Sequence, residues 1–506
     1  MDKEISNGIV SFRGSQIPEF EADVLQELET ELGKQFTLVN EIKFSVQMGF
    51  SVGNNRITGI GLDNCGISIL PESIKNLSSL EKLSLMNNQL STLPESIGNL
   101  TSLVELNLYN NKLTTLPESI KNLSSLENIS LMNNQLLTLP ESIGNLTSLQ
   151  NLYLRINQLS AIPESISNLK SLEILDLHGN QLTTLPESIR HLFSLKELHL
   201  TGNGLFTLPE SIVNLKSLEK LYLSENSIST LPESIGNLTS LQYLYLDDNK
   251  ITSLPGSINK LEKLKLLEIS YNQLSTLPES IGDLKSLTYL NANSNSIITL
   301  PESIEGIESL SILLMNSNQL TRLPESIGDI TVLNTLNLGS NQLKNLPSSI
   351  IKLEKLESLV LSTNQLHTLP ESIGNLKSLV ELYLDNNKIT TLPESINKLE
   401  ILKRLDISQN QLTTLPESIG GLTSIQTLSL YSNQLTTLPK SIGDLTSLHE
   451  LWLSANKLIT LPESMSNLTS LRELDIAENI LDSNAKSLLT QLEEMNGVNI
   501  TMKYIL

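Results

Sequence analysis

The chain has 506 residues, of which 39% are hydrophobic and 4% aromatic, and 55 acidic against 34 basic residues give it a formal net charge of −21. This acidity disfavours binding to nucleic acid or to an anionic membrane, since both attract basic surfaces. No run approaches the roughly 20 apolar residues that span a bilayer, and the single cysteine, Cys65, cannot form an intrachain disulfide. Residues 1–15 lack the apolar stretch of a secretory signal. We therefore expect a cytoplasmic protein that does not bind membranes.

The first 59 residues precede the regular part of the sequence. Residues 1–20 are expected to be a flexible tail. Residues 21–59 are predicted to form an N-terminal cap, which begins with a helix over residues 21–33 that Gly33 ends. Strands are then predicted over EIKFSV (41–46) and over FSVGNNRITGIGL (50–62), and the second bends at Gly53-Asn54-Asn55 into a hairpin.

Residues 60–481 repeat with a period of 23 residues, and eighteen of the 19 prolines recur at this spacing from Pro71 to Pro462. The unit reads L-x-x-L-x-L-x-x-N-x-L-x-x-L-P-E-S-I-x-x-L-x-S. Leu244 and Leu246 alternate as in a strand with one buried face, and Asn249 can satisfy backbone groups where the chain leaves that strand. Proline suits the first position of a short helical turn, and the glutamate that follows suits its positive end. The pattern predicts 19 repeat strands.

This unit resembles the leucine-rich repeat, whose L-x-x-L-x-L-x-x-N/C-x-L signature it carries throughout. The resemblance implies an α/β fold, a horseshoe solenoid with a parallel sheet on its concave side and short helical turns on its convex side. We expect α/β caps at both ends. The 23-residue L-P-x-S-I form is similar to scaffolds of the Ras-group or Ras-suppressor type and their microbial relatives. That similarity implies binding to other proteins, including small GTPases or phosphatases.

Residues 482–506 are predicted to form the C-terminal cap. A helix begins at Asp482 or Ser483 and ends at Gly497. Residues 498–506 then alternate as a final edge strand.

The candidate binding site is the concave face of the predicted sheet. Four positions in each strand point away from the core, and nine of the ten tyrosines and the single tryptophan fall on them. Both residue types are over-represented among binding hot spots, although tyrosine also stacks across strands for purely structural reasons. The predicted protein-binding residues are Tyr153, His199, Tyr222, Glu225, Tyr243, Tyr245, Asp247, Asp248, Glu268, Tyr271, Tyr289, Leu314, Tyr383 and Trp452.

Five of these tyrosines fall on four consecutive predicted strands, among four acidic residues. This arrangement predicts a partner protein that presents basic residues around an apolar centre. Arginine suits such a patch best, since it pairs with carboxylates and stacks on aromatic rings.

No arrangement in the sequence predicts catalysis, a metal or a cofactor. Asp176 and His199 share a position on adjacent predicted strands, beside His178 and Tyr153, but no recognised motif supplies a nucleophile or a zinc ligand set. The favoured function is a non-enzymatic scaffold. A surface or secreted adhesin of the internalin type and a structural solenoid without a dedicated site are the alternatives, and the sequence leaves the oligomeric state open.

Overall fold

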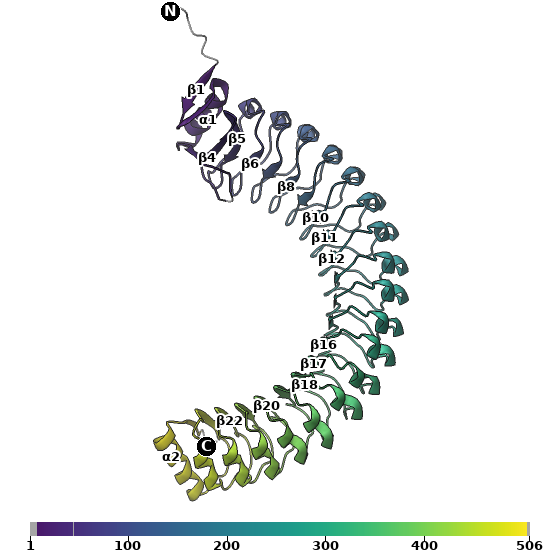
Figure 1. The fold of residues 1–506 in the computed structure, drawn as a ribbon, viewed down its shortest axis with the longest axis vertical. Coiled ribbons are helices and arrows are strands. Elements are labelled where there is room, and N and C mark those ends of the chain that lie inside the picture. Colours follow the sequence, from purple (N-terminus) through teal and green to yellow (C-terminus); the bar gives the residue numbers. More distant parts are fainter. Residues whose placement is uncertain (1–7, 44, 503–506) are drawn as a thin grey trace, which may run out of the picture. The chain divides into compact units, whose positions relative to one another are not determined.

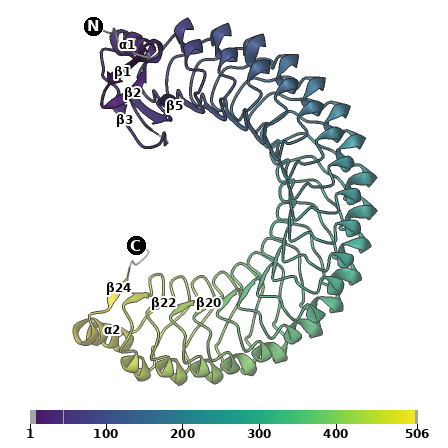
Figure 2. The same ribbon diagram turned by 45° about the horizontal axis from the view of Figure 1, so that its top comes forward.

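The computed structural model describes residues 8–43 and 45–502, and the chain divides into two compact units, residues 1–250 and 251–506. Each unit is a repeat solenoid in which short parallel strands line the inner side of the curve and 3-10 helices line the outer side (Figures 1 and 2). The predicted fold class is thereby confirmed.

The first unit opens with a cap that begins earlier than expected. Strands β1 (Ile9–Phe12) and β2 (Ser15–Pro18) form an antiparallel hairpin, which leads directly into helix α1 (Glu19–Leu32). The expected flexible tail over residues 1–20 is therefore wrong for residues 8–20, which form this hairpin and the start of α1, and residues 1–7 lie outside the described residues. As predicted, Gly33 ends α1 in the left-handed conformation.

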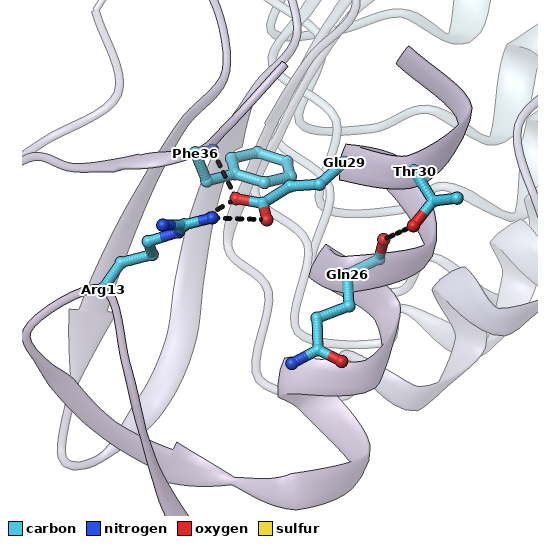
Figure 3. A network of polar contacts seen from close by, with 5 residues as sticks. All are labelled: Arg13, Gln26, Glu29, Thr30 and Phe36. Atoms are coloured by element: carbon cyan, nitrogen blue, oxygen red, sulfur yellow. Dashed lines mark hydrogen bonds and ion pairs between the residues drawn. The ribbon is translucent and has the colours of Figure 1, made fainter. Parts of the chain in front are cut away.

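A polar network fastens this hairpin to the helix (Figure 3). The guanidinium of Arg13 donates two hydrogen bonds to the carboxylate of Glu29, at 3.2 and 2.8 Å. Glu29 also accepts from the backbone N–H of Phe36 at 2.6 Å. Because these contacts lie 16 and 7 residues apart in the chain, local sequence patterns do not reveal them.

The rest of the cap pairs with the repeat sheet. Strand β3 (Thr37–Leu38) runs parallel to β4 (Gly49–Gly53), and β4 forms the predicted hairpin with β5 (Arg56–Gly61). The strand predicted over residues 41–46 is absent from its described residues, 41–43 and 45–46. Instead Lys82 reaches out to Glu41 at 3.1 Å, and the carbonyl of Val46 accepts from the N–H of Asp63.

The repeat strands of the first unit are parallel, in register and three residues long. They are β6 (Lys82–Ser84), β7 (Glu105–Asn107), β8 (Asn128–Ser130), β9 (Asn151–Tyr153), β10 (Ile174–Asp176), β11 (Glu197–His199), β12 (Lys220–Tyr222) and β13 (Tyr243–Tyr245). The central leucine or isoleucine of each is almost completely buried, which contributes about 1.5–3 kcal/mol per side chain. The flanking residues point to the open face.

The outer side carries one 3-10 helix in each repeat. They run from η1 (Glu72–Asn76) to η8 (Glu233–Asn237) at intervals of 23 residues, and each follows a proline in extended conformation. The glutamates after these prolines were expected to interact with their own helices. In several repeats they instead accept from the next helix, as Glu95 does from the backbone N–H of Ser119 at 3.1 Å.

The conserved period also brings the asparagines into a buried ladder. The side chain of Asn134 donates to the carbonyls of Leu108 and Leu131, both at 3.0 Å, and accepts from the N–H of Leu113 at 3.0 Å. Leu108 and Leu113 belong to the preceding repeat, so each asparagine joins two repeats. The predicted role of the asparagine at the strand exit is thus observed.

The residue before each of these asparagines has a positive φ. In the first unit these include Asn133 (55°), Ile156 (55°) and Gly179 (64°). Asparagine and glycine tolerate this conformation, whereas a β-branched residue is strained in it. Ile156 is also 48% exposed, so packing does not obviously compensate for the strain.

The second unit continues the same pattern. Its strands are β14 (Leu266–Glu268), β15 (Tyr289–Asn291), β16 (Ile312–Leu314), β17 (Thr335–Asn337), β18 (Ser358–Val360), β19 (Glu381–Tyr383), β20 (Arg404–Asp406), β21 (Thr427–Ser429), β22 (Glu450–Trp452) and β23 (Glu473–Asp475). Helices η9 (Gly256–Lys260) to η18 (Glu463–Asn467) follow at the same interval.

Helix α2 (Ser483–Asn496) closes the second unit. The Asp482 side chain accepts from the N–H of Ala485 at 2.8 Å and caps the helix at the predicted place, and Gly497 ends it. Strand β24 (Asn499–Thr501) then pairs with β23 in parallel. Part of the predicted edge strand, residues 503–506, lies outside the described residues.

Candidate functional site

The open face of the first unit carries one continuous column of large polar and aromatic side chains. The last residues of β9 to β13 are aligned by the strand register, and we call them the central column: Tyr153, Asp176, His199, Tyr222 and Tyr245. All five are half-buried. The sequence prediction therefore placed the four of them that it included on one surface.

Three rings of the central column form a stack. The ring centroids of His199 and Tyr222 are 4.2 Å apart with an interplanar angle of 14°, and those of Tyr222 and Tyr245 are 4.7 Å apart at 7°. Burial raises the pKa of the Tyr222 hydroxyl. The stack presents ring edges and hydroxyl groups to solvent as a rigid surface, because each ring is held by its neighbour.

An ion pair lies beside this stack, in the column formed by the first residues of the strands. Glu197 accepts from the Lys220 ammonium at 2.9 Å and contacts the His199 ring nitrogen Nε2 at 3.3 Å. Burial alone would raise the pKa of Glu197, but the hydrogen bonds from Lys220 and His199 outweigh it and lower that pKa. Tyr243 follows Lys220 in the same column.

Three of the acidic residues predicted for the site, Glu225, Asp247 and Asp248, follow strands β12 and β13 along one rim of the face. Glu225 and Asp248 are exposed and have φ of 54° and 52°. Asp247 accepts from the Ser224 hydroxyl at 2.5 Å. Their carboxylates therefore edge the ring stack without covering it.

The pairing of Asp176 and His199 that could suggest chemistry is a register contact between β10 and β11. The side-chain oxygen of Asp176 accepts from the backbone N–H of His178 at 3.0 Å, while the His199 ring contacts Glu197. Among residues 8–43 and 45–502, no three His, Cys, Asp or Glu side chains gather as metal ligands would.

In the second unit the predicted residues are dispersed. Glu268 accepts from the Asn291 side chain at 2.9 Å. Tyr271 is 64% exposed at a left-handed position with φ 51°. Tyr289 lies in the column of Leu266 and Ile312, not in that of Glu268.

The remaining predicted residues of this unit do not meet. Leu314 lies between Asn291 and Asn337 in its column. Tyr383 is on β19 and Trp452 on β22, with β20 and β21 between them. Leu314, Tyr383 and Trp452 therefore lie in separate parts of the second unit.

Sequence reasoning missed a hollow on the open face of the first unit. It has a volume of about 630 Å³, and Met86, Tyr109, Met132 and Asp176 line it together with the predicted Tyr153. A signal for it existed in the sequence. On β7 and β8 the positions aligned with the central column hold the smaller Asn107 and Ser130. The step from small to large side chains at Tyr153 is therefore visible when the repeats are aligned.

No helix within the described part of the chain is long and apolar enough to cross a membrane.

Comparisons with known proteins agree with this architecture. The sequence matches the family described as leucine-rich repeat region over residues 59–158, 138–226, 187–269, 233–319, 312–386 and 382–502, which together span 59–502. No curated protein matches the chain.

Several solved structures are similar. The LRR protein LIC12759 of Leptospira interrogans is 34% identical, with a TM-score of 0.65 over 86% of this chain and 99% of that one. YopM from Yersinia enterocolitica is 29% identical, with a TM-score of 0.63 over 88% and 91%. The plant peptide hormone receptor RGFR1, solved in complex with RGF2, is 27% identical, with a TM-score of 0.56 over 88% and 90%. With the family match and the repeat architecture, these findings show that the chain belongs to the leucine-rich repeat proteins.

Proposed function

We propose that the chain is a non-enzymatic scaffold that binds another protein through the open sheet face of its first unit. The observation that carries this proposal is the stack of His199, Tyr222 and Tyr245 on that face. Rigid aromatic side chains lose little conformational entropy on binding and form the centres of many protein interfaces. A partner with a basic surface around an apolar centre fits this face, because carboxylates lie along one rim beside the rings.

The proposal extends to the signalling role of the protein and to its location in the cell. The resemblance to Ras-group scaffolds supports a role in signalling through small GTPases or phosphatases. A cytoplasmic location is supported by the lone Cys65, which is a free thiol. The receptor RGFR1, solved with RGF2, supports a proteinaceous ligand for this chain as well.

The competing account is that the stack only stabilises the sheet. Stacked pairs are worth about 0.5–1.5 kcal/mol each beyond burial, so the rings have a structural value in either case. Tyr222→Phe preserves the stacking and removes only the hydroxyl group. Tyr222→Ser removes both, and comparing the two variants separates the ring from the hydroxyl group in binding.

Affinity capture from lysate of the source cells tests the proposal. The baits are the intact chain, a variant with Tyr222→Ser and Tyr245→Ser, and a control with Phe193→Ser. The Phe193 ring is 54% exposed, just beyond helix η6 (Glu187–His191) and off the sheet face. We expect the intact and control baits to retain a partner that the double variant loses, with circular dichroism unchanged. Equal capture by all three baits would contradict the proposal.

A further inference from the structure

The hollow on the open face beside the central column is lined by apolar, aromatic and acidic side chains. Its volume of about 630 Å³ falls in the range of about 300–1,000 Å³ that is typical of ligand sites. It extends over strands β6 to β10, all within the first unit. The hollow is thus large enough for a short peptide segment.

Its shape follows from side-chain size in three adjacent columns. On β7 and β8 the positions aligned with the central column hold the smaller side chains of Asn107 and Ser130. On β9 the same position holds the larger Tyr153, which lines one side of the hollow. Met132 and Tyr109 stand on the adjoining column and are half-buried. An apolar and aromatic enclosure results, and methionine can adapt its shape to an occupant.

The floor of the hollow includes an unused polar group. The Ser130 hydroxyl oxygen is buried and has no hydrogen-bond partner in the described structure. Buried hydroxyl groups are normally paired.

The charges around the hollow favour a cation. Glu105 lines it near one end, where its charge is partly offset by Lys82 at 3.7 Å, and Lys82 is also paired with Glu41 at 3.1 Å. Asp176 lines the other end and makes no ion pair with a basic side chain within the described residues.

The nearby negative charges affect the pKa of Tyr153. Burial raises the pKa of its hydroxyl group, and the charges of Asp176 and Glu197 raise it further. Arg155, the nearby basic residue on the same repeat, is exposed and does not line the hollow. The end of the hollow next to Asp176 therefore presents a carboxylate that forms no ion pair among the described residues.

We propose that this hollow anchors one arginine side chain within an extended segment of the partner protein. The guanidinium pairs with Asp176 and stacks on the Tyr153 ring, and an adjoining apolar residue of the segment fills the space between Met86, Tyr109 and Met132. Arginine fits better than lysine because its planar group can pair with a carboxylate and stack on a ring at once. This assignment rests on the proposed protein-binding function and locates its anchor.

A library of random heptapeptides, displayed on phage and panned on the full chain, provides the first test. The expected result is enrichment of peptides that carry an arginine next to an apolar residue. An enriched peptide is then titrated by fluorescence anisotropy, together with analogues in which citrulline or lysine replaces the arginine. Citrulline keeps the shape of arginine but removes its charge, and we expect it to weaken binding at least tenfold.

Protein variants then locate the contact. Asp176→Asn keeps an acceptor for the His178 N–H, so it preserves the local fold. It should weaken the arginine peptide at least tenfold and leave the citrulline peptide nearly unchanged. Met132→Lys should abolish binding of both, and Glu187→Gln, which alters an exposed carboxylate at the start of η6 (Glu187–His191), should change neither.

Three results would overturn the anchor proposal: no enrichment, enrichment of peptides without arginine, or unchanged binding to Met132→Lys. Capture of the cellular partner by the same variants tests the proposed function separately. If that partner is lost with Tyr222→Ser and Tyr245→Ser but retained by Asp176→Asn and Met132→Lys, the open face binds the partner and the anchor proposal fails. If none of these variants affects the partner, both proposals fail.

Discussion

Removing one asparagine from the buried ladder should destabilise the first unit by an amount that the structure defines. Asn134→Ala deletes the hydrogen bonds to the carbonyls of Leu108 and Leu131 and from the N–H of Leu113, all at 3.0 Å. A longer contact to the Met132 carbonyl, at 3.3 Å, is lost as well. At about 1 kcal/mol for each of the three short bonds, the free energy of unfolding should fall by about 3 kcal/mol.

The ladder also predicts a specific departure from additivity. The Leu108 carbonyl accepts from both Asn111, at 3.1 Å, and Asn134. Either single substitution leaves this carbonyl one partner, whereas Asn111→Ala combined with Asn134→Ala leaves it neither asparagine. The double variant should therefore lose about 1–3 kcal/mol more than the sum of the single variants. Asn180 bonds to different carbonyls, so Asn134→Ala with Asn180→Ala should be additive.

Urea denaturation followed by circular dichroism and by tyrosine fluorescence gives these free energies, and agreement of the two signals checks that unfolding is cooperative. Equal coupling in both pairs would refute the reasoning. It would mean that the shared carbonyls do not determine the energy of the ladder.

Three further substitutions test other parts of the repeat. Ile156→Asn should raise the free energy of unfolding by about 1 kcal/mol, measured in urea, because it relieves a β-branched residue at φ 55°; an unchanged value would show that this position is not strained. The hydrogen bond from the Ser349 N–H lowers the pKa of Glu325. The ionised carboxylate of Glu325 therefore stabilises the folded chain above the ordinary pKa of about 4.3, and this stabilisation disappears as the pH falls through the lowered pKa. Glu325→Gln should therefore reduce the urea midpoint at pH 7 and match the parent chain once the pH lies below the lowered pKa, and a constant difference would contradict this. Gly328→Ala should cost about 1–3 kcal/mol, since its Cβ would lie 2.2 Å from the Ser349 carbonyl oxygen, whereas Gly256→Ala, with open space around it, should not destabilise the chain in the same assay.

The repeat itself was predictable because each position has one local task. The alternation of Leu244 and Leu246 predicts a strand with a buried face, and both side chains are completely buried. The asparagine position predicts backbone hydrogen bonds, and Asp482 predicts the start of a helix. These signals lie within a few residues of the structure they specify.

The N-terminal cap shows why other parts were not predicted. At the turn of the hairpin over residues 9–18, Arg13 contacts Glu29, and Glu41 pairs with Lys82, 41 residues further along the chain. Neither pairing has a sequence signature. Likewise, the glutamates of the outer side contact the next repeat because neighbouring helices lie side by side, which a single repeat does not reveal.

The sequence predicts which side chains of the candidate site are aligned across the strands, but it does not predict the hollow between them. The shared phase of His199, Tyr222 and Tyr245 predicts that their rings are neighbours, and the structure brings them to 4.2 and 4.7 Å. The hollow depends on the relative heights of side chains in three columns. The clustering of tyrosines in the sequence predicts a binding patch over residues 222–289, whereas the hollow lies over β6 to β10.

Site-specific photo-crosslinking tests the central claim, that the open face of the first unit binds a protein, most directly. A benzophenone amino acid replaces Tyr222 in one protein and Phe193 in another, so that the same reactive ring lies either in the stack or off the sheet face. Irradiation in lysate of the source cells should yield a discrete covalent adduct from position 222 that is absent from position 193. Adducts only from position 193, or from neither position, would contradict the claim.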